Sequence, residues 1–474
     1  MKNKPKEPSR IAVKFANMVF VLGILYFILF IVYAIYKIYN PPEFVSLVFY
    51  IIAILCGGVF ATLFGLGLKR LSNNLKVNLS VLFFTIGITV YGFEIYLDLN
   101  KETPCGFIRV SKKEIIAKQM GVTCDTRTRM EVLDDLRDSG VEAFPSVFPY
   151  LTASNGLTAE KGRIYPLGTI SNTTTVFGNE AGYYPIIETD EHGFNNPKGL
   201  YIENKVDIVL IGDSFVEEHS DETISAVLRQ LDFTAMSIGK GGNGSLVELA
   251  TLKEYVEPLK PKIVLWLYFV GDFVNLEYEL QSSILTKYLN EDDYSQNLIS
   301  RQEEIDSVLK NYIQVEREKE REERERLLNH PVIKITKLYN LRKMINLIPT
   351  STPTSTPTST PASKPIFRDI LQKSKQMVSN WNGKMYFVYL PNFPRYHSRG
   401  SEHPNRNFVM QTATELDIPI IDIHKEVFDP HSDPLSLFPF RMNCFYNAEG
   451  LRLVAEAIGK RLEADGYVPI KSRK

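Results

Sequence analysis

Three long apolar runs dominate the first hundred residues. They cover residues 15–36, 44–68 and 79–96, and the third contains a single charged residue, Glu94. A helix needs about 20 apolar residues to cross the hydrocarbon core of a bilayer, and each run is close to that length. We therefore predict a membrane domain with three transmembrane helices over residues 1–98.

The basic residues around these runs predict an orientation. Five Lys or Arg residues precede the first run, one lies in the first connection and three lie in the second. Because cytoplasmic connections carry the excess of Lys and Arg, we expect the N-terminus inside the cell and everything after residue 98 outside the cytoplasm. Cys105 and Cys124 would then lie in an oxidising environment, where a disulfide is one expectation and two free thiols are the other.

Beyond residue 200, short apolar runs alternate with amphipathic stretches. Strands are predicted at residues 206–211, 262–269, 384–390 and 418–423, and helices at residues 246–259, 366–381 and from Asn447 onward. Such alternation predicts a parallel sheet covered on both faces. We assign residues 201–470 to this α/β domain and residues 99–200 to a connecting segment.

Two insertions interrupt the predicted α/β domain. Residues 301–329 are dense in Glu and Arg, often with opposite charges four residues apart, which predicts a solvent-exposed helix. This helix is also a candidate docking surface for another membrane protein. Residues 350–365 repeat Thr-Pro-Thr-Ser, which cannot bury a core, so a disordered tether is expected there.

The overall composition excludes some classes of function. Lys plus Arg number 54 and Asp plus Glu number 55, so the chain lacks the basic excess of nucleic-acid-binding proteins. The four cysteines form no Cys-x-x-Cys pair that would indicate a zinc or redox centre. We expect membrane lipid as a partner, and no nucleic acid, metal or diffusible cofactor.

A motif with candidate chemistry ends the first predicted strand. Residues 206–214 read Val-Asp-Ile-Val-Leu-Ile-Gly-Asp-Ser, which puts Ser214 at the carboxyl edge of the sheet, where open α/β sheets bind ligands. A helix that begins at this serine would direct its free amides toward a developing oxyanion. An ordinary strand–turn–helix, in which the serine only caps the helix, would have the same sequence pattern.

Three later segments raise the significance of this serine. They read Ser-Ile-Gly-Lys-Gly-Gly-Asn-Gly-Ser at residues 237–245, Val-Leu-Trp-Leu-Tyr-Phe-Val-Gly-Asp at 264–272 and Phe-Tyr-Asn-Ala-Glu-Gly-Leu-Arg-Leu-Val-Ala-Glu-Ala-Ile at 445–458. With the serine motif they resemble, in order, the four blocks of the SGNH/GDSL hydrolase superfamily. The resemblance implies a three-layer, flavodoxin-like α/β domain in which Ser214 is a nucleophile for acyl esters and the amides of Ser214 and Gly242 hold the oxyanion.

The third block departs from the family pattern. The oxyanion asparagine is expected just after Gly271, but Asp272 stands there. A carboxylate would repel an oxyanion that an amide would stabilise. Asn275, three residues further on, is the candidate substitute.

The last block departs more severely. Phe445 stands where the resemblance places the catalytic histidine, and Met442 where it places the orienting aspartate. The expected base and its orienter are therefore both missing. Among the seven histidines, His431 is the first candidate for a rescue base because Asp429 lies two residues before it; the lesser candidates are His192, His219 and His424.

These features predict a membrane-anchored acyl-ester hydrolase or O-acyltransferase of SGNH/GDSL type, acting weakly or not at all on O-acyl groups of glycans outside the cytoplasm. The rivals are an inactive relative that binds a glycan or protein through the same cleft, and a scaffold that docks through residues 301–329. We expect Ser214, Gly242 and Gly271 to converge at the sheet edge, with Phe445 facing the serine.

Overall fold

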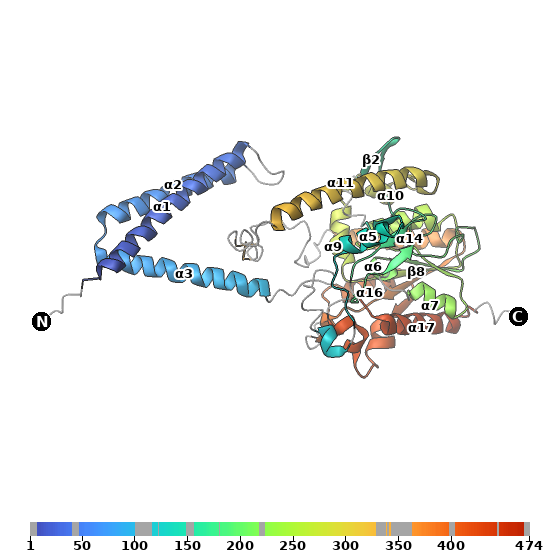
Figure 1. Cartoon of the computed structure of the whole chain (residues 1–474). Coiled ribbons are helices and arrows are strands. Elements are labelled where there is room, and N and C mark those ends of the chain that lie inside the picture. The colour runs from blue at the N-terminus through green and yellow to red at the C-terminus, as the bar shows by residue number, and fades with distance from the viewer. Residues whose placement is uncertain are drawn as a thin grey trace. The chain divides into compact units, whose positions relative to one another are not determined.

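The computed structural model divides the chain into two compact units, each described by itself (Figure 1). The first comprises residues 1–101 and 323–354, and the second comprises residues 102–322 and 355–474. The structure describes residues 7–39, 47–99, 116–121, 123–147, 156–179, 181–217, 223–328, 338, 341–342, 363–397, 403–442 and 445–468. Cys105 lies outside these ranges, so the disulfide stays a prediction.

Three helices form the described N-terminal part of the first unit. They are α1 (Arg10–Tyr39), α2 (Leu47–Arg70) and α3 (Asn73–Leu99). Each is long and apolar enough to cross a membrane, as predicted. Small residues bring α1 and α2 together, since a Cβ at Gly23 would lie 2.4 Å from the ring of Phe64. The orientation of the three helices stays a prediction.

Five parallel strands form the central sheet of the second unit. They are β6 (Ile208–Ile211), β7 (Ala235–Ser237), β8 (Ile263–Tyr268), β9 (Lys384–Tyr389) and β10 (Ile420–Asp422), in the order β10-β9-β8-β6-β7. The predicted parallel α/β sheet is confirmed. β10 begins after Pro419, which has no amide hydrogen to donate. The strand order is flavodoxin-like and reverses between β6 and β8, the point at which such sheets bind ligands.

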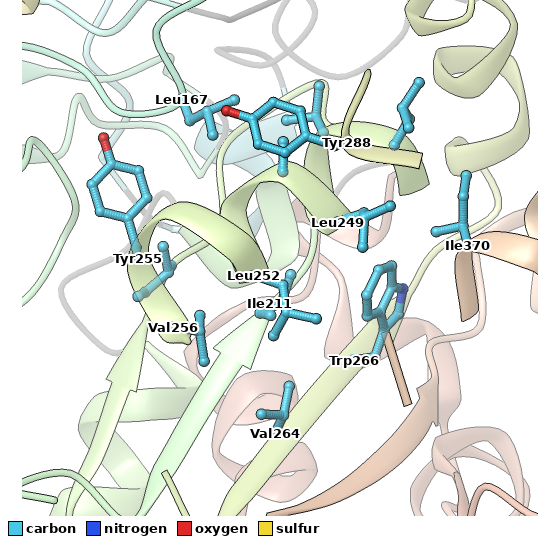
Figure 2. Close-up of a cluster of buried hydrophobic side chains, with 14 of the residues drawn as sticks. Leu167, Ile211, Leu249, Leu252, Tyr255, Val256, Val264, Trp266, Tyr288 and Ile370 are labelled. Atoms are coloured by element: carbon cyan, nitrogen blue, oxygen red, sulfur yellow. The ribbon is translucent and has the colours of Figure 1, made fainter. Parts of the chain in front are cut away.

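Both faces of this sheet are buried, which makes the domain three-layered. Side chains of β8 alternate between two apolar clusters, with Val264 and Trp266 in one and Ile263 and Leu265 in the other. The first cluster includes side chains from α8 (Ser245–Thr251), its continuation η2 (Leu252–Val256), α9 (Asp272–Glu279), α14 (Ser363–Asn380) and α16 (Arg406–Glu415). The second includes side chains from α7 (Ile224–Gln230) and α17 (Ala448–Ala464). Figure 2 shows Leu249 and Leu252 of the first helix layer beside Trp266 and Ile211 of the sheet.

The described part of the connecting segment shares its core with this domain. It contains α5 (Arg129–Asp138), the small sheet β1-β4-β5 (Ala143–Pro145, Thr174–Val176, Ile186–Glu188) and the hairpin β2-β3 (Leu157–Ala159, Gly162–Ile164). Tyr165 and Leu167 join the first apolar cluster. Asn196 fastens the segment to β7, because its side chain accepts from the Ser237 amide at 2.8 Å and donates to the Ser237 carbonyl at 2.7 Å.

The charged insertion forms α11 (Gln302–Leu328), preceded by a short turn (Leu298–Arg301). Its N-terminal half is not a purely solvated helix. Ile305, Leu309 and Ile313, four residues apart, are buried in the first apolar cluster, and the Asp306 carboxylate accepts from the Ser171 amide and hydroxyl at 2.9 and 2.6 Å. The sequence analysis did not predict this apolar stripe, because charged residues surround its members in the sequence.

The predicted tether is shorter than expected at its C-terminal end. Helix α14 begins at Ser363, so residues 363–365 are helical rather than disordered. Residues 350–362 lie outside the described residues. The closing helix begins where predicted, since Asn447 is the N-cap of α17 and its side chain accepts from the Gly450 amide at 3.0 Å.

Candidate active site

Ser214 is the first residue of the short helix α6 (Ser214–Glu217), directly after β6 at the carboxyl edge of the sheet. The turn needs a glycine before it, because a Cβ at Gly212 would lie 2.8 Å from the Leu267 carbonyl oxygen. Asp213 Oδ1 accepts from the Phe215 amide at 3.0 Å and so caps the helix. The serine itself is only half-buried. The sequence and the geometry agree on this turn.

The loop after β7 packs directly against the serine turn. A Cβ at Gly239 would lie 2.3 Å from the Val216 Cβ, so this position admits only glycine without displacement. Gly242 has a φ of 79°, in the left-handed region that glycine adopts at little cost. Asn243 donates its side-chain amide to the Gly212 carbonyl at 3.2 Å. The structure therefore brings the Gly242 loop and the Ser214 turn together.

The loop after β8 completes this edge of the sheet. It carries Gly271, the N-cap of α9, and Asn275 in the first turns of that helix. Asn275 donates its side-chain amide to the Asn243 carbonyl at 3.0 Å, which joins the third loop to the second. One of its two amide hydrogens is thus used inside the protein.

Asp272 differs from what its sequence position indicated. Its side chain is fully buried, and Oδ2 accepts from the Phe269 amide at 3.0 Å. Burial raises the pKa of Asp272 well above its usual value, and the neighbouring carboxyls of Glu248 and Asp213 raise it further. Both effects favour the neutral, protonated form of this carboxyl, which would repel an oxyanion less than a carboxylate would.

Asp272 belongs to a group of four buried carboxyls, with Asp213, Glu248 and Glu279. Burial raises the pKa of Asp213 and of Glu279 to about 7, and that of Glu248 well above its usual value. For Asp213 the hydrogen bonds from Phe215 and Ser214 oppose this effect. Within the described residues, no group of three His, Cys, Asp or Glu side chains is arranged to hold a metal ion.

These carboxyls predict that the second unit loses stability as the pH rises from about 5 to 8. Asp213 and Glu279 bind protons more tightly in the folded state, so their contribution is complete below their unfolded values and is lost as the pH rises through about 7. At about 1.4 kcal/mol per pKa unit, each group accounts for a loss on the order of 3 kcal/mol.

The measurement is denaturant unfolding of the full chain in detergent, followed by tryptophan fluorescence. Both tryptophans of the chain, Trp266 and Trp381, lie in the second unit and report its unfolding. Glu279→Gln should flatten the pH dependence, whereas Glu188→Gln on the surface should leave it unchanged. A free energy of unfolding that rises between pH 5 and 8 would contradict the assignment.

Phe445 lies beside the serine turn. Its ring centroid is 5.0 Å from that of Phe215, the residue after Ser214, in an edge-on contact. Phe269, from the loop after β8, contacts the same Phe215 ring at 4.4 Å, and Tyr446 contacts it at 4.8 Å. The rings of Phe269, Phe445 and Tyr446 therefore all pack on the residue that follows the serine.

No histidine in the described part of the chain hydrogen-bonds the Ser214 hydroxyl; these histidines are His192, His397, His403, His424 and His431. His431 instead accepts from the Asp433 amide at 3.1 Å through Nδ1, and Asp429 is exposed. The structure therefore does not join His431 or Asp429 to the serine. His219 lies outside the described residues.

The other candidate histidines have partners of their own. His424 lies between the Arg395 guanidinium and the Tyr396 hydroxyl, at 2.8 and 2.9 Å. Burial and the nearby Arg395 lower its pKa. His192 is buried with its Nδ1 3.1 Å from the Gln302 side-chain oxygen. These contacts fit packing and anchoring roles.

The sequence analysis missed a buried ion pair beside the Gly242 loop. Lys240 pairs with Glu217, and their side chains are 1% and 3% exposed. A lysine between two glycines of a loop is common in protein sequences, and Glu217 lies just after the Gly-Asp-Ser motif. Neither residue by itself indicated an ion pair. The one available signal was the lack of any other charge within residues 237–245.

No protein-family model and no curated protein matches the chain. Solved structures do. One is a lipolytic protein of the G-D-S-L family from Desulfitobacterium hafniense DCB-2, 13% identical, with 53% of this chain and 97% of that chain covered and a TM-score of 0.29. Another is an alpha/beta hydrolase enzyme from the metagenome of Lake Arreo, Spain, 14% identical, with 56% and 98% covered and a TM-score of 0.31. At this distance neither likeness assigns an activity.

Proposed function

We propose that the second unit is an SGNH/GDSL-type domain that binds O-acyl esters and turns them over slowly at most. The observation that supports it is the half-buried Ser214 at the reversal point of a parallel sheet, with the Gly242 loop packed on its turn. The substrate class would be acyl groups on glycans outside the cytoplasm, which depends on the predicted membrane orientation.

In this proposal Ser214 Oγ attacks the ester carbonyl carbon, and the carbonyl oxygen becomes an oxyanion. The amides of Ser214 and Gly242 donate to that oxyanion. The serine proton has to leave as the new bond forms; the Phe445 ring cannot accept it, so it passes to solvent water at the half-buried serine. Collapse of the oxyanion then breaks the ester C–O bond and expels the alcohol, which takes up a proton from water, and a second water molecule hydrolyses the acyl-serine. Without a base, oxyanion donors and binding alone sustain a residual catalysis of ~10³–10⁴ over water.

A second candidate is an acyl-glycan-binding domain without turnover. The aromatic group of Phe215, Phe269 and Phe445 favours it, because apolar rings beside the serine suit binding better than proton transfer. In both proposals α11 remains a candidate contact for a membrane-protein partner, through the face opposite its buried stripe.

We predict that a fluorophosphonate labels Ser214 in the full chain slowly, over hours rather than minutes. A serine without a base is a weak nucleophile, while preorganised amide donors still stabilise the charge that develops on the probe. Labelling is followed by intact mass and peptide mapping, in detergent-solubilised protein.

Ser214→Ala is the variant that removes the site, and Ser245→Ala is the matched control, a buried serine of the neighbouring loop. Labelling on Ser214 alone supports the proposal. Labelling within minutes, together with robust turnover of an acetyl ester that Ser214→Ala abolishes, would show that a base outside the described residues serves the serine. No labelling at all would favour the binding domain.

A further inference from the structure

We propose that Lys240 and Glu217 are positioning residues that hold the Gly242 loop in register with Ser214. The inference rests on the proposed function for the meaning of the loop. Its geometry is independent of that function: Glu217 ends the helix that begins with Ser214, and Lys240 lies two residues before Gly242.

The Glu217 carboxylate uses both oxygens on this loop. Oε1 accepts from the Lys240 ammonium, and Oε2 accepts from the Gly241 amide at 2.7 Å. The ammonium also donates to the Ser146 hydroxyl at 3.0 Å, which is itself 3.4 Å from Glu217 Oε1. One buried carboxylate thus fixes a side chain and a backbone amide of the same loop, and a residue of the connecting segment completes the network.

A second carboxylate holds the far end of the loop. Glu279, on α9, accepts from the amides of Gly244, Leu246 and Val247 at 2.5, 3.0 and 3.2 Å. Gly242 therefore lies between two amides, those of Gly241 and Gly244, that are each bound to a buried carboxylate. The loop segment that would donate to the oxyanion is therefore held at both ends. We call the two carboxylates that hold it, Glu217 and Glu279, the clamp.

The clamp makes the orientation of Gly242 sensitive to the ion pair. A buried charge that loses its partner is strongly unfavourable, so without Lys240 the Glu217 carboxylate would take up a proton or turn toward water. Either change weakens the Gly241 hydrogen bond and frees the segment that carries Gly242. Oxyanion donors act through fixed orientation, so a mobile loop lowers reactivity without removing the serine.

Lys240→Met in the full chain tests this inference, with two readouts. Hydrogen exchange of the amides of residues 241–244 should become at least tenfold faster, while exchange of β8 stays unchanged. The maximal rate of fluorophosphonate labelling of Ser214 should fall ~10–100-fold, less than the ~10²–10³-fold loss of a whole oxyanion donor because the amide is loosened rather than removed, with the half-saturating probe concentration within about twofold of the wild type.

Asp422→Asn is the matched control. It breaks a second buried ion pair, between Arg406 and Asp422, whose side chains are 12% and 9% exposed at the opposite edge of the sheet. It should leave both readouts at the loop unchanged even if it lowers the thermal stability. Should Lys240→Met fail to fold, the double variant Lys240→Met with Glu217→Leu removes both charges and gives the same loss of loop protection.

Unchanged exchange at residues 241–244 in a folded variant overturns the inference, as does equal loss of labelling in Asp422→Asn. Absence of labelling in the wild type overturns the proposed function and, with it, a catalytic meaning for the clamp. Faster exchange confined to the loop together with a lower maximal labelling rate supports both.

Discussion

Replacing Phe445 by histidine is expected to raise ester hydrolysis ~10²–10⁴-fold, the usual contribution of a positioned general base. Residue 445 contacts the ring of the residue that follows the serine, and it is half-buried, so an imidazole there would lie beside the serine turn with access to solvent. The measurement is hydrolysis of an acetyl ester by the full chain, with Ser214→Ala in the same background as the control for site-specific turnover.

The orienting residue should add to this gain. A histidine base works best when a carboxylate fixes its tautomer and ring. Met442 is half-buried at the position where the family resemblance implies that carboxylate. We therefore expect Phe445→His with Met442→Asp to exceed Phe445→His alone. Tyr467→His, three residues beyond the C-terminal end of α17 and beside Tyr386, is the control for a new histidine away from the serine.

The same experiment tests the state of Asp272. A neutral carboxylic acid and an amide have almost the same shape, so Asp272→Asn should change the activity of Phe445→His by less than about threefold. A large gain from Asp272→Asn would show that a negative charge was present after all. No gain from Phe445→His in a folded protein would show that the last block is not built around the serine.

Much of the fold could be predicted because it depends on local patterns. Apolar runs of about 20 residues predict the three helices that are long enough to cross a membrane, and uninterrupted apolar runs such as Val264–Tyr268 predict the strands that are buried on both faces. The position of Ser214 followed from a strand that ends in Gly-Asp-Ser. These features are encoded within a few neighbouring residues, so one sequence suffices to find them.

The parts that could not be predicted depend on partners distant in sequence. The pKa of Asp272 is raised by burial and by the carboxyl of Glu248, which belongs to another helix. The role of Lys240 depends on Glu217 and Ser146, and the latter lies 94 residues away. His192 was a lesser candidate for the base in the sequence, although its contacts, with Asp190 and Gln302, are structural.

Asp190→Ala is expected to cost on the order of 5 kcal/mol in the free energy of unfolding of the second unit. The carboxylate is fully buried and accepts four hydrogen bonds. The amides of His192 and Phe194 donate to Oδ1, both at 2.9 Å. The Asn196 amide and the Tyr201 hydroxyl donate to Oδ2, at 3.0 and 3.1 Å. Each buried donor left without an acceptor costs about 1–3 kcal/mol, and an alanine supplies none.

We also expect Asp190→Ala to disturb the candidate site. A loss of packing alone would not have this effect. Asn196, held by Asp190, exchanges two hydrogen bonds with Ser237, the last residue of β7, and the Gly242 loop begins just beyond it. Denaturant unfolding followed by tryptophan fluorescence measures the stability, and the rate of Ser214 labelling measures the loop. Glu188→Ala, a surface acid of the same segment whose side chain is 67% exposed, should change the stability by less than about 0.5 kcal/mol. A loss below about 1.5 kcal/mol in Asp190→Ala would show that water replaces the carboxylate, and that the segment is held to the sheet mainly by its apolar contacts.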